Sequence, residues 1–329
     1  MMSQSPKEDW PYRLSKTRKK LKIAVAFTLV CLVWGSTYLA IKIGVQSIPP
    51  FLLGGMRFLV SGAIILAISL LRPNQRKISR SDTVYAGFTG VLMFAGSNGL
   101  VNFAEQTVGS GLAALISATI PLWLVAFETL AESEHRLSPK GRLGLVLGFI
   151  GVVLLILPDL ASHNFHVAIG EVALVVGSIC WATGSWITSQ HKFQTATVLL
   201  SAIQMLVGGI VMIVISIAQG VFQSQVFAGI VIQSWWALAY LIIFGSCIAF
   251  TAYVYLLQNV VASRVTTYAY VNPMVALLLG VMILNEPLTF WILTGTTVIL
   301  TSLWLIRRPG GNTDDWAISG GESKSTPSS

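Results

Sequence analysis

Apolar runs of about twenty residues follow one another along most of this chain, with short polar links between them. A helix of that length matches the roughly 30 Å hydrocarbon core of a bilayer. Because that core offers no water to backbone groups, a spanning segment must satisfy them internally, which favours helices. We therefore expect an all-α integral membrane protein with ten transmembrane helices. They cover residues 23–43, 51–71, 84–104, 110–131, 142–157, 168–189, 198–218, 234–257, 262–284 and 288–306, and the fifth is short for a span.

Composition agrees with a lipid environment. The chain is 54% hydrophobic and only 10% charged, whereas a soluble domain carries about 25% charged residues. Its net charge of +8 comes from basic residues scattered through short links, without the single basic patch that a nucleic-acid partner needs. The cysteines, Cys31, Cys180 and Cys247, lie inside apolar runs and predict no disulfide framework. The expected partners are the lipid bilayer and a small-molecule substrate, with no nucleic acid and no cofactor; a homo-oligomer is compatible with the sequence.

Almost all of the 21 lysines and arginines lie on one side of the expected helices. They occur in the N-terminal segment 1–22, in alternate links and in the tail 307–329, while Lys42 and Arg57 lie inside or at the edge of a span. Because positively charged links stay in the cytoplasm, we expect both termini there, in a cell inner (plasma) membrane. The first run has no clear cleavage site and is expected to be retained. The Gly- and Ser-rich tail is expected to be disordered.

The second half of the chain repeats the organisation of the first. Five spans precede the midpoint and five follow it, and a proline lies midway in the fourth span of each set, Pro121 and Pro273. An odd number of helices per repeat turns the second copy upside down. We therefore expect two inverted five-helix repeats, at 23–157 and 168–306. Such repeats are the usual construction of secondary transporters, whose substrate site lies near the bilayer midplane.

The two matched prolines are candidate hinges. Proline lacks the N–H that a helix interior needs and crowds the preceding turn. Carbonyls freed in this way are tolerated in a bilayer only where protein or an aqueous cavity satisfies them. Pro121 and Pro273 therefore indicate either hinge positions beside a cavity or simple packing kinks.

Three stretches resemble a known family: "VWGSTYLAIKIGVQSIPPFLLGGMRFLVSG" at 33–62, "YAYVNPMVALLLG" at 268–280 and "NEPLT" at 285–289. They are similar to EamA-type transporters of the drug/metabolite transporter superfamily, especially ten-helix bacterial inner-membrane carriers. The resemblance covers residues 23–306 and implies ten helices, two EamA repeats and a central substrate cavity. Characterised relatives mostly export amino acids or other small metabolites. The first repeat departs from the pattern, because "LAESEHRLS" stands where the second has a simple Asn-Glu turn, which puts the role of Glu134 in doubt.

The third expected helix carries a polar stripe. Asn98, Asn102, Glu105 and Gln106 follow the i, i+4, i+7, i+8 spacing of one helical face. Polar groups are costly against lipid, so this face should point to the bundle interior or a water-filled cavity. The alternative is interhelical hydrogen bonding. The matching region of the second repeat is aromatic and aliphatic, and its candidates for the cavity wall are Phe250 and Tyr253.

Aromatic and polar residues one turn apart recur on three other spans. These pairs are Trp34 with Tyr38, Trp181 with Ser185, and Tyr268 with Asn272. Aromatic residues also anchor helices at the membrane interface, but the two tryptophans lie near the centres of their spans. The pairs therefore predict either the lining of a substrate cavity or plain packing.

Charge inside the membrane is the clearest functional signal. Arg57 lies about 9 Å into the second helix at 1.5 Å per residue, and Lys42 and Glu105 should lie near the same level. An intramembrane ionisable residue is a functional candidate whose partner should be named. We predict an Arg57–Glu105 pair that binds or couples transport, or a structural ion pair that fixes the outer end of the bundle.

Several other signals do not support an enzyme. "GSGLAA" at 109–114 mimics a dinucleotide loop but follows no strand, and His163 and His166 have no further metal ligands in their link. Gly144, Gly148 and Gly151 predict close helix packing. We expect a secondary transporter of small organic metabolites, working in efflux by alternating access. A proton-coupled exchanger or importer is the alternative, and a membrane enzyme or receptor-like protein without transport is the alternative of another class.

Overall fold

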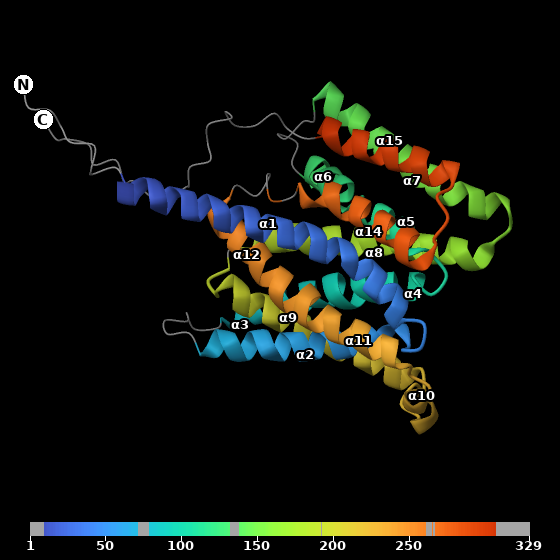
Figure 1. Ribbon diagram of the computed structural model, residues 1–329, viewed down its shortest axis with the longest axis horizontal. Coiled ribbons are helices and arrows are strands. Elements are labelled where there is room, and N and C mark those ends of the chain that lie inside the picture. The colour runs from blue at the N-terminus through green and yellow to red at the C-terminus, as the bar shows by residue number, and fades with distance from the viewer. Residues whose placement is uncertain are drawn as a thin grey trace, which may run out of the picture.

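Figure 1 shows a computed structural model of the chain, which describes residues 10–71, 79–131, 138–191, 193–260, 265 and 267–306. All of the regular elements in these ranges are helices. Eight helical segments are long and apolar enough to cross a membrane, and two further apolar helices are shorter. The fold is therefore that of a helical membrane protein.

Helices of the first half overlap the first five predicted spans. Their bounds are α1 Trp10–Gly44, α2 Pro50–Leu70, α3 Arg80–Gly90, the π-helix η1 Val91–Asn98, α4 Gly99–Ala104, α5 Ser110–Ser117, α6 Ile120–Ala131 and α7 Pro139–Ala161.

Helices of the second half overlap the other five. They are α8 Phe165–Gln190, α9 Thr197–Ala218, α10 Ser224–Ala228, α11 Ile232–Tyr240, the π-helix η2 Leu241–Ile248, α12 Ala249–Asn259, α14 Tyr268–Leu284 and α15 Phe290–Ile306. The last two have 17 residues each and are the shorter apolar helices.

Two predicted boundaries were wrong. Helix α1 begins at Trp10 within the basic segment, because lysine and arginine are good helix formers and carry no apolar signal. Helix α7 runs to Ala161 and includes Pro158, which was expected to start a link. The fifth span is thus 23 residues long and not short. The predicted disordered tail 307–329 and Glu134 lie outside the described residues.

The two matched prolines behave differently. The fourth span is interrupted at residues 118–119, directly before Pro121, where α5 ends and α6 begins. Helix α14 continues through Pro273 without interruption, so its place as a hinge or a packing kink stays a prediction. Pro273 is the sixth residue of α14 and removes only one hydrogen bond near the start of that helix.

A π-helical segment lies in the middle of each third span. The segments η1 and η2 are both eight residues long and both continue directly into the helices on either side. A π-helix widens the turn and is frequent at functional sites. Nothing in the apolar pattern indicated either segment.

Helices of the two halves are interleaved and not separate. Helix α2 packs on α9, and α7 packs on α15, so each of these pairs joins corresponding spans. Helix α1 packs on α14 and α12, while α8 packs on α6 and on η1 and α4. Exchanging each span for its counterpart maps these pairings onto one another, whereas, among the described helices, the packing of α7 on α8 and of α1 on α5 has no comparable counterpart. In Figure 1 the α7–α15 pair forms one edge of the bundle and α2 lies at the opposite edge.

Close contact between α7 and α15 depends on glycine. A Cβ atom added to Gly144 would meet Leu305 and Ile306, and one added to Gly151 would lie 2.7 Å from Ile299. The predicted close packing of these glycines is confirmed, and it holds the outer edge of the bundle together.

The link between α8 and α9 is tied to the start of α3. Asp82 accepts hydrogen bonds from the backbone N–H groups of Gln194 (3.0 Å) and Thr195 (2.9 Å), and from the Thr195 hydroxyl (2.7 Å). His191 lies 3.0 Å from its other oxygen. At the corresponding place of the other half, Ser47 bonds Ser234 at 2.8 Å at the start of α11. This role of Asp82 was not predicted.

Candidate functional site

Three of the predicted aromatic residues meet between α1, α12 and α14. The ring of Trp34 lies 5.0 Å from Tyr253 and 5.0 Å from Tyr268, measured between centroids. Phe250 stands 6.3 Å from Tyr253 at the edge of this cluster. The indole N–H of Trp34 donates to the carbonyl of Gly245 in η2 at 3.1 Å. Trp34 is therefore held by the π-helix, because its orientation depends on a carbonyl there.

A second aromatic cluster forms around the other π-helix. Trp181 of α8 lies 5.9 Å from Phe94 of η1, and Phe94 lies 4.9 Å from Phe58 of α2. The guanidinium of Arg57 stands 4.7 Å from the ring of Phe58. Tyr38 and Ser185, predicted beside the two tryptophans, are both half-buried. Each predicted tryptophan thus contacts the π-helix of a third span.

Arg57 connects α2 to the second half of the chain. The residue is buried, and its Nε–H donates to the hydroxyl of Ser246 in η2 at 2.9 Å. A Cβ atom added to Gly245 would lie 2.9 Å from the Thr37 methyl group and 3.3 Å from a guanidinium nitrogen of Arg57, so a larger residue would crowd this approach. Ser246 was not predicted, because a single serine in an apolar run is common.

The predicted contact between Arg57 and Glu105 was wrong. Both carboxylate oxygens of Glu105 are buried and have no hydrogen-bond partner, and Arg57 bonds Ser246 instead. The two side chains, together with the phenol of Tyr38, lie within electrostatic range of one another. The bundle interior therefore holds a cation and a carboxylate that do not neutralise each other by contact. Such a pair is costly unless another group can bind it.

Lys42 lies at the level predicted for it, next to Glu105. Its ammonium donates to the backbone carbonyls of Glu105 (2.7 Å) and Val108 (2.8 Å), just beyond the end of α4. A lysine at this position satisfies carbonyls that the helix itself leaves unpaired. The bond leaves the Glu105 side chain free.

Glu286 joins the two halves at the same end of the bundle. Its carboxylate accepts from the backbone N–H of Ser110 (2.7 Å) and of Gly111 (3.1 Å), at the start of α5. Negative charge is favoured at a helix N-terminus. The "NEPLT" link between α14 and α15 therefore caps a helix of the first half.

The polar stripe of the third span is divided among different roles. Asn102 is buried and donates to the Pro50 carbonyl at 3.0 Å, while Asn98 donates to a carbonyl within its own π-helix. Gln106 is exposed, because α4 ends before it and a turn follows, so it does not lie in the bundle interior, one of the two positions expected for the stripe. On α14, the Asn272 amide, with its oxygen and nitrogen exchanged, would donate to the carbonyls of Tyr268 in the same helix (3.2 Å) and Cys31 in α1 (3.1 Å). Asn102 thus makes an interhelical bond of the kind expected as the alternative for the polar stripe.

One more buried carboxylate was not predicted. Glu171 of α8 is fully buried, and the carboxyl group of Asp159 in α7 lies within hydrogen-bond reach of it. It is not among the residues that contact Arg57. In the part of the chain that the structure describes, no three His, Cys, Asp or Glu side chains gather as metal ligands would.

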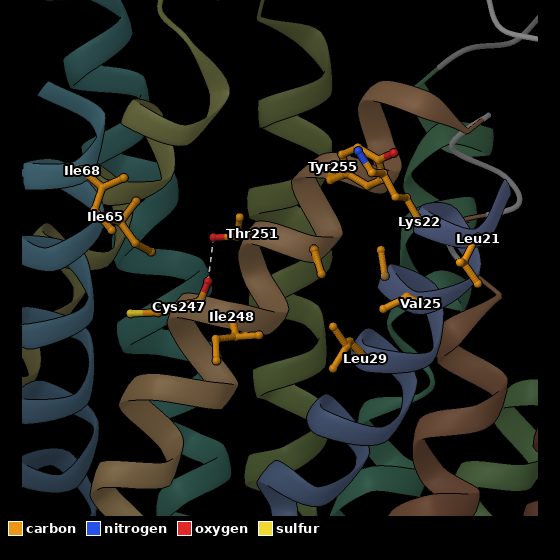
Figure 2. A pocket seen from close by; sticks show the side chains of 12 residues that line it. Leu21, Lys22, Val25, Leu29, Ile65, Ile68, Cys247, Ile248, Thr251 and Tyr255 are labelled. Atoms are coloured by element: carbon orange, nitrogen blue, oxygen red, sulfur yellow. Dashed lines mark hydrogen bonds between the residues drawn. The ribbon is translucent and has the colours of Figure 1, made fainter. Parts of the chain in front are cut away.

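An open groove lies elsewhere, between the outer faces of α1, α2, η2 and α12 (Figure 2). Its volume is about 730 Å³. None of the predicted site residues lines it. The buried polar groups around Arg57 and this groove are therefore two separate features.

Comparison with known proteins identifies the family. The model of the EamA-like transporter family matches twice, over residues 21–157 and 168–308. The chain belongs to this family. It is accordingly a membrane transporter, as the resemblance of three sequence stretches implied.

Relatives of this EamA-like transporter occur in Escherichia coli and Bacillus subtilis. It is 36% identical over 289 residues to the uncharacterized inner membrane transporter YedA of Escherichia coli K12, covering 87% of this chain and 91% of that one. It is 22% identical to the uncharacterized transporter YoaV of Bacillus subtilis 168, covering 87% and 96%. A solved crystal structure has the same fold, with a TM-score of 0.59, 21% identity and coverage of 87% and 96%.

Proposed function

We propose that this protein is a secondary transporter of small organic metabolites, such as amino acids or related amphipathic solutes, and that it works in efflux. The solute would bind among Arg57, Glu105 and Tyr38, with the aromatic clusters of Trp34 and Trp181 on either side. Apolar walls with a few polar anchors suit a solute of mixed character. The protein would reside in the cell inner membrane, as its relative YedA does by description.

The observation that carries this proposal is a pair of buried ionisable groups in the interior, Arg57 and Glu105, that do not contact each other. One N–H of Arg57 donates to the Ser246 hydroxyl, and Glu105 has two buried oxygens without a hydrogen-bond partner. Buried polar groups in proteins are ordinarily satisfied, and exceptions need an explanation. A solute that carries both an acceptor for Arg57 and a donor for Glu105 would satisfy them.

The mechanism we propose is alternating access of two inverted repeats. All ten apolar helices would cross the membrane, five in each half. Support comes from the two matches to the family model and from the main helix pairings, which map onto one another when corresponding spans are exchanged. Arg57 contacts Ser246 and Glu286 contacts Ser110, so bonds cross between the halves at two levels. Rocking of one half against the other would make and break these bonds.

The orientation we propose has both termini in the cytoplasm. Described basic residues lie near the start of three helices, at Lys20 in α1, Arg80 in α3 and Lys140 in α7. These helices begin the first, third and fifth spans, which would all start on the same side of the membrane. Positively charged link residues favour the cytoplasmic side. The end of the bundle that Lys42 and Glu286 occupy would then face outward.

Transport in sealed liposomes tests the proposal. Purified protein would be screened with labelled amino acids and related metabolites, and saturable uptake of one compound is the expected result. Arg57→Ala should abolish that uptake, whereas Arg142→Ala, which removes an exposed arginine at the start of α7, should not. Elution as one species and an unchanged amount of inserted protein would show that both variants are intact. Uptake at the wild-type rate in Arg57→Ala would refute the assignment.

Proton coupling is a second candidate, favoured by the unpartnered carboxylate of Glu105. A buried carboxyl that gains and loses a proton could couple solute movement to a pH gradient. Glu105→Gln should then transport without responding to an imposed gradient. If wild-type uptake already ignores the gradient, the protein is a facilitator.

A further inference from the structure

The groove between α1, α2 and α12 has apolar walls along most of its length (Figure 2). Leu21, Val25 and Leu29 stand one turn apart on α1 and form one wall; Ile68 of α2 and Ile248 of η2 belong to the other side. All five side chains are exposed. In a membrane such a hollow cannot hold water without a cost, because it offers almost no hydrogen-bonding groups. Its occupant should therefore be a hydrocarbon chain.

One end of the groove is strongly basic. A second cavity of about 420 Å³ is lined by Arg18, Lys19, Lys22, Tyr255 and Asn259. It shares Lys22 and Tyr255 with the apolar groove, so the two form one continuous surface. Within the described ranges, no ion pair joins these three cations to an acidic side chain. Three positive charges therefore meet at this end of the groove, which suits an anion.

We propose that this groove binds one anionic membrane phospholipid. The acyl chain would lie between α1 and α12, and the phosphate would sit between Arg18, Lys19 and Lys22. Neither half of the surface selects this ligand alone, since lipids of any charge have acyl chains and any soluble anion is attracted to lysine. With the cytoplasmic N-terminus proposed above, the basic end faces the leaflet that carries anionic headgroups. The site is separate from Arg57 and Glu105, which line neither cavity.

Lipid binding by the purified full-length protein tests the proposal. After delipidation in detergent, native mass spectrometry would compare phosphatidylglycerol with phosphatidylcholine of the same acyl chains. We expect one tightly bound phosphatidylglycerol per chain, with an affinity about tenfold or more above that for phosphatidylcholine. Glycerol 3-phosphate, which has the anion without the chains, should not displace it at equal concentration.

The contribution of charge is tested by removing the three cations. Arg18→Gln combined with Lys19→Gln and Lys22→Gln should reduce the affinity for phosphatidylglycerol to that for phosphatidylcholine. Lys20→Gln is the charge control, because Lys20 belongs to the same segment but lines neither cavity.

Thr251→Trp should block both lipids by filling the groove. Thr251 is exposed there, and its hydroxyl bonds only the Cys247 carbonyl one turn earlier, at 2.7 Å. Thr301→Trp is the matched control: Thr301 is also exposed and makes the same kind of bond on α15, outside the groove.

Several results would overturn the proposal. Equal affinity for the two lipids, or an equal loss in Lys20→Gln, would show that the contact is unspecific. Binding that survives Thr251→Trp would place the lipid elsewhere, and displacement by glycerol 3-phosphate would indicate a soluble anion. Unchanged thermal unfolding of each variant without lipid is the control for folding. Because Thr251→Trp leaves the cations intact, the test stands even if the triple variant does not fold. Transport of a solute is not measured, so the outcome is independent of the proposed function.

Discussion

Replacement of Glu286 by glutamine should loosen the start of α5. The carboxylate accepts from two backbone N–H groups, those of Ser110 and Gly111. The isosteric amide keeps one acceptor oxygen, but its NH₂ group then faces the second N–H and cannot accept from it. A hydrogen bond to a charged group contributes about 1.5–3 kcal/mol. We therefore expect a loss of roughly 2 kcal/mol in the free energy of unfolding.

Two measurements check this expectation. In detergent, the midpoint of thermal unfolding should fall by about 4–8 °C, using the scale for large domains. Hydrogen exchange should accelerate in peptides that contain Ser110 and Gly111 and stay unchanged in α9. Glu128→Gln is the matched control. It makes the same carboxylate-to-amide change on α6, where Glu128 has no hydrogen bond to another described residue. If Glu286→Gln behaves like this control, or if exchange at Ser110 and Gly111 does not change, the capping argument is wrong.

Three further substitutions test the packing of the bundle. Asp82→Asn should destabilise the protein by about 1–3 kcal/mol and speed exchange in the α8–α9 link, because an amide cannot accept all of the bonds that the carboxylate does. Gly90→Ala should lower the free energy of unfolding by about 1–3 kcal/mol, since its Cβ would press on the backbone of α9. A Cβ at Gly87 would make only ordinary contacts, so Gly87→Ala should change that free energy little. Trp34→Phe keeps an aromatic ring but removes the hydrogen bond to the Gly245 carbonyl, so the midpoint temperature of thermal unfolding should fall by about 2–6 °C.

The positions of the helices could be predicted because lipid imposes a simple rule. A run of apolar residues long enough for the bilayer must be helical, so each predicted range contains a helix. The start of α1 could not be found in this way, since it lies among basic residues outside the apolar run. The π-helices also escaped prediction. Their turns are wider by one residue, but the side chains remain apolar, and hydropathy does not distinguish the two kinds of turn.

Two residues of the candidate site could be predicted from the sequence, but their contacts could not. Arg57 stood out because charge is rare in a membrane span, and the structure buries it in the interior. Its partner could not be read from the spacing of residues, because the wider turn of η2 brings the Ser246 hydroxyl and the Gly245 backbone toward α2. Glu105 was found for the same reason as Arg57, yet the Lys42 ammonium contacts its carbonyl and not its carboxylate. Sequence patterns identify costly residues; local helix geometry decides which of them meet.

The two halves are alike in packing but not in chemistry, and this difference limits how a solute can bind. Arg57 and Glu105 both come from the first half, while the second half offers Ser246 and the aromatic residues Tyr253 and Tyr268. In the proposed site, the charged groups would come from the first half and the hydroxyl and aromatic groups from the second, so a bound solute would have a preferred orientation. Its polar end would remain with the first half in both states of the transporter. Among the contacts of Arg57, the one that would change on rocking is then the hydrogen bond from its guanidinium to the Ser246 hydroxyl, which has one charged partner and not two and is easier to exchange than a buried ion pair.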